Sequence, residues 1–155
     1  MGKIRNLGTS TMRFKEGLYV SGSASNENGT DSEYSLIVSG SVFVDGNINV
    51  MGSSKIMSRE VNSFPYAVAA NDYVILVAGV GSPRSINLPP KATNLGRILI
   101  IKDASANANS NNIQINPDGS EDIDQASDKL INKSKSAITI ICASDQWHII
   151  GYYEA

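Results

Sequence analysis

The side chains that could do chemistry are few in this sequence, and they do not stand in a known catalytic spacing. His148 is the only histidine, and it follows Trp147 and precedes apolar residues. A lone histidine can act as a base or as a metal ligand, but typical sites add a cysteine, a second histidine or a placed carboxylate. The sequence also has no nucleophile elbow, no glycine-rich phosphate loop before a helix and no HExxH motif. We therefore predict a protein that is not an enzyme and that uses no cofactor.

A group of acidic residues near the turn-forming sequence Asn116-Pro117-Asp118-Gly119 is the second candidate for chemistry. Carboxylate oxygens are the ligands that calcium prefers, but this group lacks the spacing of an EF-hand loop. We interpret it as a solvated turn and predict no metal site. The group comprises Asp118, Glu121, Asp122 and Asp124.

A single cysteine, Cys142, lies within an apolar stretch, so the sequence predicts a small core residue and no internal disulfide.

The remaining candidates are aromatic side chains, which stack on sugars or anchor interfaces when they are exposed. The enzymatic alternative is a carbohydrate hydrolase whose two facing carboxylates come together between subunits. The aromatic candidates are Trp147, Tyr66, Tyr73, Tyr152 and Tyr153.

The elements that must position these side chains are β-strands, and residues 97–103 form the central one. Ile98 and Ile100 point to one side of this strand, while Leu99 and Ile101 point to the other. A strand with two apolar faces is covered on both sides. Residues 73–77 and 138–142 repeat the pattern. Because each sheet of a two-layer fold buries only one face, we expect another copy of the chain to cover the surplus apolar surface.

The spacing of the strand signals predicts the fold class. Signals recur every 8 to 12 residues from Tyr66 onward, as in all-β sandwiches and barrels, and no segment has a helical period. We predict an all-β protein with an antiparallel, jelly-roll-like β-sandwich at residues 66–155. The expected strands are 66–69, 73–78, 85–88, 97–103, 112–116, 129–132, 136–143 and 147–153.

The segment before this domain divides into three predicted parts. Residues 1–16 are interpreted as an extended docking arm and residues 55–65 as a linker. Residues 17–54 contain a six-residue period in which Val38, Val44 and Val50 align, as in hexapeptide β-helices and fibre stems. We predict a short β-stem there. An ordinary hairpin that pairs residues 42–44 with 48–50 around Asp45-Gly46 is the alternative.

Charge and hydropathy exclude two classes of partner. The formal net charge is −2 and aromatic residues make up 6% of the chain, which does not fit the basic, aromatic surface that binds nucleic acid. No apolar run approaches the roughly 18 residues needed to span a bilayer. We therefore expect neither nucleic-acid binding nor membrane insertion.

Residues 66–153 resemble a module near the C-terminal end of tailed-bacteriophage fibre and other virion appendage proteins. The resemblance rests on Asp72-Tyr73 before an apolar strand, Ile101-Lys102-Asp103-Ala104 before an Asn-rich loop, and the closing Trp147-x-Ile149-Ile150-Gly151. Ile86-x-Leu88-Pro89, Gly96 and Asn112-Ile113-x-Ile115 also match. The resemblance implies a homotrimer without enzymatic activity.

Together these features predict a trimeric structural protein of a phage virion, assembled in the host cytoplasm and attached to other virion proteins. As a fibre it would contact a host glycan or protein, and as a capsid decoration or cement protein its arm would grip the shell. A carbohydrate-binding or carbohydrate-active protein is the further alternative. The predicted trimer interface is Val38, Val44, Val50, Leu99 and Ile101, and the predicted receptor contacts are Asn107, Asn109, Asn111, Asp118 and Trp147.

Overall fold

The computed structural model describes residues 42, 44 and 46–155. The chain divides after Met51, and the unit Gly52–Ala155 carries all strands of the described part. The predicted arm, residues 1–16, and Val38 lie outside the described residues. Residues 46–57 contain no strand, so the described portion of the predicted stem shows neither a β-helix rung nor the second half of the alternative hairpin.

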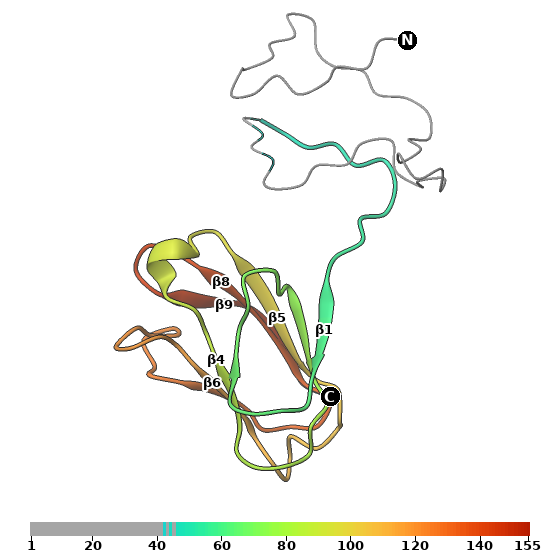
Figure 1. The fold of residues 1–155 in the computed structure, drawn as a ribbon, viewed down its shortest axis with the longest axis vertical. Coiled ribbons are helices and arrows are strands. Elements are labelled where there is room, and N and C mark those ends of the chain that lie inside the picture. The colour runs from blue at the N-terminus through green and yellow to red at the C-terminus, as the bar shows by residue number, and fades with distance from the viewer. Residues whose placement is uncertain (1–41, 43, 45) are drawn as a thin grey trace, which may run out of the picture. The chain divides into compact units, whose positions relative to one another are not determined.

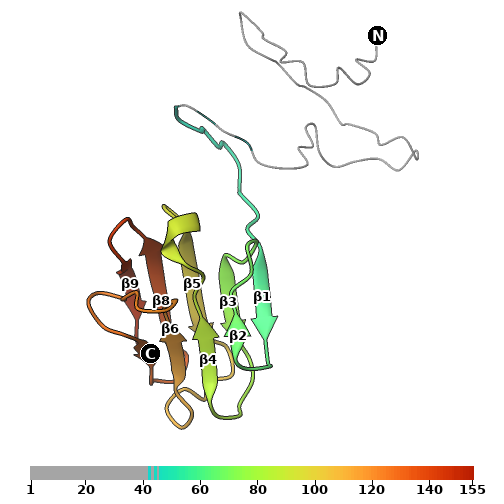
Figure 2. The same ribbon diagram turned by 60° about the vertical axis from the view of Figure 1, so that its left-hand side comes forward.

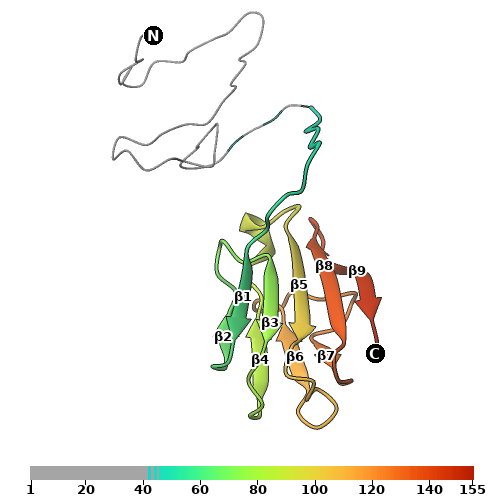
Figure 3. The same ribbon diagram turned by 90° about the vertical axis from the view of Figure 1, so that its right-hand side faces the viewer.

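Nine strands form two mixed sheets, and the only helical segment in this described part is the short 3-10 turn η1 (Lys91–Thr93). One sheet has the order β1-β3-β5-β8-β9 (Figure 3), and the other has the order β2-β4-β6-β7. The protein is therefore nearly all β, as predicted. The first sheet consists of β1 (Ser58–Val61), β3 (Val74–Val77), β5 (Ile98–Asp103), β8 (Ala137–Cys142) and β9 (Trp147–Tyr153). The second consists of β2 (Tyr66–Ala67), β4 (Arg84–Asn87), β6 (Ile113–Asn116) and β7 (Lys129–Ile131).

The path of the chain between the two sheets corrects the prediction of an antiparallel, jelly-roll-like arrangement. From β1 to β6 the chain alternates between the sheets (Figure 1, Figure 2), so β1, β3 and β5 are parallel neighbours, as are β2, β4 and β6. Only β7, β8 and β9 pair in the antiparallel sense. Parallel neighbours need a long crossover connection. Here each crossover contains a strand of the opposite sheet instead of a helix.

All eight strand positions expected from residue 66 onward contain strands, but one strand was missed. β1 lies within residues 55–65, which were predicted to be a linker, and pairs in parallel with β3. Its sequence, Ser58-Arg59-Glu60-Val61, buries only Val61 and so carries little apolar signal. An edge strand that is covered on one side alone does not need an apolar run.

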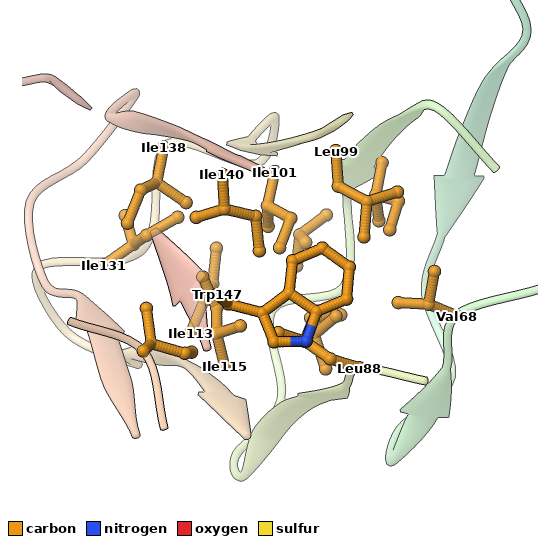
Figure 4. Packing of buried hydrophobic residues seen from close by; sticks show 14 of the residues in the cluster. Val68, Leu88, Leu99, Ile101, Ile113, Ile115, Ile131, Ile138, Ile140 and Trp147 are labelled. Atoms are coloured by element: carbon orange, nitrogen blue, oxygen red, sulfur yellow. The ribbon is translucent and has the colours of Figure 1, made fainter. Parts of the chain in front are cut away.

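The core contains side chains from both sheets. In β3, β5 and β8, buried residues alternate with partly exposed ones. The buried aliphatic residues of the four-stranded sheet belong to the same cluster (Figure 4). Trp147 is its largest member and is completely buried. The core aliphatics include Ile75, Val77, Ile86, Leu99, Ile101, Ile113, Ile115, Ile131, Ile138 and Ile140.

Two buried polar clusters fix the loops around this core. The guanidinium of Arg84 pairs with the carboxylate of Asp103 at 3.2 Å, and both side chains are fully buried. Asp103 also accepts hydrogen bonds from Ser105 Oγ and from the backbone N–H groups of Ala108 and Lys135. This carboxylate therefore connects the end of β5 to the Asn-rich loop and to the turn before β8.

Asp72 has a similar role at the edge formed by β1. Its carboxylate accepts hydrogen bonds from Arg59 Nε at 2.5 Å, from the Tyr66 hydroxyl at 2.6 Å and from the Ala69 N–H at 2.8 Å. Burial acts to raise the pKa of Asp72, but the hydrogen bonds from Tyr66 and Arg59 outweigh it, so the net pKa lies below the ordinary value. This carboxylate thus joins β1, β2 and the turn before β3.

Candidate contact surfaces

The outer face of the five-stranded sheet is apolar at its centre. The side chains that alternate with the core residues of β3, β5 and β8 are partly buried and mostly branched or long aliphatics. Two polar residues interrupt them: Lys102 is opposite Leu76, and Thr139 is opposite Ile100. Ile100 lies beside Val74, and Ile98 lies beside Ile141, across neighbouring strands. We call Val74, Leu76, Ile98, Ile100 and Ile141 the apolar face. The flank on β1 is polar, with Ser58 and Glu60. The flank on β9 has the polar His148 opposite Ile141 and the exposed Tyr153 opposite Ala137, with the ammonium group of Lys102 over its ring.

The outer face of the four-stranded sheet is different in character. Its partly buried positions on β4 and β6 carry Ser85, Asn87, Gln114 and Asn116. The Asn116 amide donates to Asn87 Oδ1 at 3.1 Å across the parallel strands. One side of the molecule is therefore apolar and the other is rich in amides, and only the apolar side resembles the centre of a protein interface.

The structure corrects two predicted interface residues. Leu99 and Ile101 are completely buried within a single chain, because they point toward the four-stranded sheet. They cannot contact a second copy unless the core opens. The opposite side chains of the same strand, Ile98 and Ile100, carry the surplus apolar surface instead. Of the other predicted interface residues, Val44 is 43% exposed and Val50 is 60% exposed.

Trp147, a predicted receptor contact, is also in the core. Its side chain has no exposed surface, and its indole N–H has no hydrogen-bond partner among the described residues. It packs among aliphatic side chains of both sheets (Figure 4). Within the pattern Trp147-x-Ile149-Ile150-Gly151, Trp147 belongs to the core and Ile149 packs against it, whereas Ile150 is exposed. The pattern therefore does not present the indole ring to a ligand.

The other predicted receptor contacts do not converge on one site. Asn107, Asn109 and Asn111 lie in the loop before β6, whereas Asp118 lies in the loop after it, at the opposite end of that strand. Asn107 and Asn111 both donate their amide N–H groups to the Val80 carbonyl, at 3.1 and 2.9 Å. These two side chains therefore hold loops together, while Asn109 and Asp118 are exposed.

A groove that sequence reasoning missed runs between β7 and β9. It has a volume of about 670 Å³, and its lining includes Tyr152 and Ile149 on one side and Leu130, Asp128 and Asn132 on the other. Tyr152 is opposite Ile138 and Ile149 is opposite Ile140, so both belong to the core-facing side of β9. The five-stranded sheet has one strand more than its partner, and this leaves the inner face of β9 open. Only the exposed tyrosine gave a sequence signal.

His148 lies between two carboxylates, one of which, Asp124, also lines the groove. Its Nε2 is 3.0 Å from Asp145 Oδ1, and its Nδ1 is 3.4 Å from Asp124 Oδ1. The hydrogen bond to Asp145 raises the pKa of His148, and the charge of Asp124 adds to the effect. This arrangement favours the protonated imidazolium. It lacks a serine, a cysteine or a second histidine that would make it a nucleophilic or metal site.

Cys142 is almost completely buried, and burial raises the pKa of its thiol. Within the residues that the structure describes, no group of three or more histidine, cysteine and acidic side chains is placed to hold a metal ion. In the same part of the chain, no helix has the length and apolar character required to cross a bilayer.

No protein-family model matches the chain, and a search of curated proteins finds no match.

Proposed function

We propose that this protein is a non-enzymatic structural component of a tailed-phage virion, and that copies of it associate through the apolar face. In this proposal the two sheets form the β-sandwich head of a homotrimeric appendage, which attaches to other virion proteins and contacts the host surface. The apolar face is the observation that carries it. Five partly exposed aliphatic side chains lie on neighbouring strands of this face, with Thr139 and Lys102 beside them, and apolar patches with polar neighbours mark interaction surfaces.

The energetics favour burial of this face. A fully buried aliphatic side chain contributes about 1.5 to 3 kcal/mol relative to an exposed one. The side chains of the apolar face are already partly covered by their neighbours in the sheet, so each would gain a fraction of that value. Closed symmetry multiplies this gain, because every copy contributes the same patch. The resemblance of residues 66–153 to virion appendage modules supports a trimer as the closed form.

The decisive experiment is native mass spectrometry of the full chain and two variants. We expect the wild type to be a trimer. We expect Ile100→Glu, which places a charge in the apolar face, to be a folded monomer with Trp147 still buried. Ser85→Glu, on the amide-rich outer face of the other sheet, is the matched control and should remain trimeric. A monomeric wild type, or dissociation by Ser85→Glu alone, would refute the proposal.

Two alternative functions are tested by separate experiments. A capsid decoration protein would present its apolar face to the shell or to its own copies, and gold labelling of intact particles distinguishes head from tail. A carbohydrate-active enzyme would need two facing carboxylates, and a hydrolysis assay on polysaccharides tests this directly. We expect no hydrolysis.

A further inference from the structure

The groove between β7 and β9 combines two kinds of wall. Tyr152 is 44% exposed and lies with Ile149 on the open inner face of β9. Leu130 of β7, which is 40% exposed, adds a second apolar contact. An exposed aromatic ring beside aliphatic side chains offers a flat apolar surface to a ligand that has one of its own.

Polar groups of mixed charge surround these apolar contacts. Asp124, Asp128 and Glu154 supply carboxylates, Lys129 supplies an ammonium group and Asn132 supplies an amide. Carboxylates accept hydrogen bonds, ammonium groups donate them, and amides do both. The lining can therefore satisfy a ligand that carries many donors and acceptors side by side.

The charges of the groove are largely compensated by their neighbours. The Glu154 carboxylate pairs with Lys133 Nζ at 2.5 Å, and Asp124 lies 3.4 Å from His148. Asp128 accepts a hydrogen bond from the neutral amide of Gln114 at 2.5 Å, and the positive charge of the lining itself comes from Lys129. Such a groove does not attract one sign of charge strongly. It fits a neutral ligand better than a polyamine, a basic peptide or a polyanion.

A strained turn fixes one of these carboxylates in advance. Asp124 and Gln125 both have left-handed backbone angles, φ 48° and 64°, which non-glycine residues rarely adopt. Hydrogen bonds hold the turn: the Asp124 N–H donates to the Trp147 carbonyl at 3.0 Å, and the Gln125 N–H donates to Gln146 Oε1 at 2.7 Å. The Asp124 carboxylate in turn accepts the Ile149 N–H at 3.3 Å. Strain maintained in this way is common where a side chain must be preorganised for a ligand.

From these observations we infer that the groove is a binding site for a neutral saccharide. The apolar C–H face of a pyranose ring would lie on Tyr152, and its hydroxyl groups would donate to Asp124 and Asp128 and exchange hydrogen bonds with Asn132. The inference rests on the proposed function, since it assigns the contact with the host surface to this groove. It moves that contact away from the Asn-rich loop.

The test is a binding measurement with defined probes and the full chain. The probes are oligosaccharides that end in glucose, galactose, mannose or N-acetylglucosamine, together with a sialylated glycan and spermine as charged comparisons. We expect at least one neutral oligosaccharide to bind and the charged probes not to bind better. Failure of all neutral probes, or preference for spermine or the sialylated glycan, would overturn the inference.

Variants locate the site. We expect Tyr152→Ala to weaken binding about tenfold, as loss of an aromatic contact does, and Tyr152→Phe to retain it. Asp128→Asn should also weaken binding. The controls are Leu95→Ala and Asp122→Asn, two exposed positions outside the groove. Equal losses in the controls would refute the assignment. Native mass spectrometry of the same samples separates the outcomes: a trimer that binds no saccharide refutes this inference alone.

Discussion

Removal of the buried carboxylate of Asp103 should destabilise the fold more than any surface change. The variant Asp103→Ala leaves the fully buried guanidinium of Arg84 without its charge partner, although Arg84 still donates to backbone carbonyls. Breaking a buried pair in this way costs about 3 to 5 kcal/mol. A domain of this size has a free energy of unfolding of about 5 to 15 kcal/mol. We therefore expect the variant to lose about a fifth or more of its stability.

The assay is guanidinium chloride denaturation followed by tryptophan fluorescence. Trp147 is the only tryptophan of the chain and is completely buried, so its emission reports on this domain specifically. Wild type and variants must be compared at one protein concentration, because association would add to the apparent stability. Asp122→Ala, an exposed acidic position, is the control and should change the free energy of unfolding by less than about 0.5 kcal/mol.

A double variant tests whether the unpaired buried charge causes the loss of stability, as distinct from the change in side-chain shape. Arg84→Met with Asp103→Leu removes both charges, and we expect it to be more stable than Asp103→Ala because no unpaired charge stays buried. If Asp103→Ala lowers the free energy of unfolding by less than about 1 kcal/mol, the value of an ordinary hydrogen bond, the carboxylate does not hold the surrounding loops together.

The contribution of the Asp103 carboxylate to the stability of the fold should also depend on pH in the acidic range. Burial acts to raise the pKa of Asp103, but hydrogen bonds from the Ala108 N–H, Ser105, the Lys135 N–H and Arg84 outweigh it and lower the pKa below its ordinary value. The ionised form therefore stabilises the folded state above the unfolded pKa, about 3.9. This contribution is lost as the pH falls through the lower folded pKa. Asp103→Asn should show a weaker loss of stability in this acidic range than the wild type.

Two further variants test local packing and charge. The hydrogen bond that protonated His148 donates to Asp145 raises the pKa of His148, so this form stabilises the fold fully below about pH 6.5 and less as the pH rises. The denaturation midpoints of wild type and His148→Gln should therefore converge as the pH rises above about 6.5. Gly79→Ala should cost about 1 to 3 kcal/mol, because the added Cβ would lie 2.6 Å from Cε2 of Phe64. Gly81→Ala has no atom within 4 Å of its Cβ and is the control; similar thermal midpoints for both variants would contradict this.

The strand positions could be predicted because a two-residue period reports directly on burial. In β5, the four consecutive aliphatics from Ile98 to Ile101 indicate two apolar faces, and the structure confirms that one face is core and the other is apolar but partly exposed. Which face is which could not be predicted. Leu99 and Ile98 are equivalent in the sequence, and only the position of the second sheet distinguishes them.

Strand direction and the groove could not be predicted for a related reason. Pairing between β3 and β5 spans an intervening strand, and no local turn signal reports on it. The groove depends on the unequal number of strands in the two sheets, which is a property of the whole fold. Trp147 was misassigned because an aromatic residue at the start of a strand has the same sequence signal whether its ring points inward or outward.

The alternation of β1 to β6 between the two sheets has a consequence for biosynthesis. β1 to β4 each pair with a strand that is synthesised only after an intervening strand of the opposite sheet. The central strand β5 gains its second neighbour only when β8 has been made, and the core receives its indole only with β9. Nascent chains should therefore lack the complete native core until β9 has been made, and long-range pairing of this kind makes folding slow.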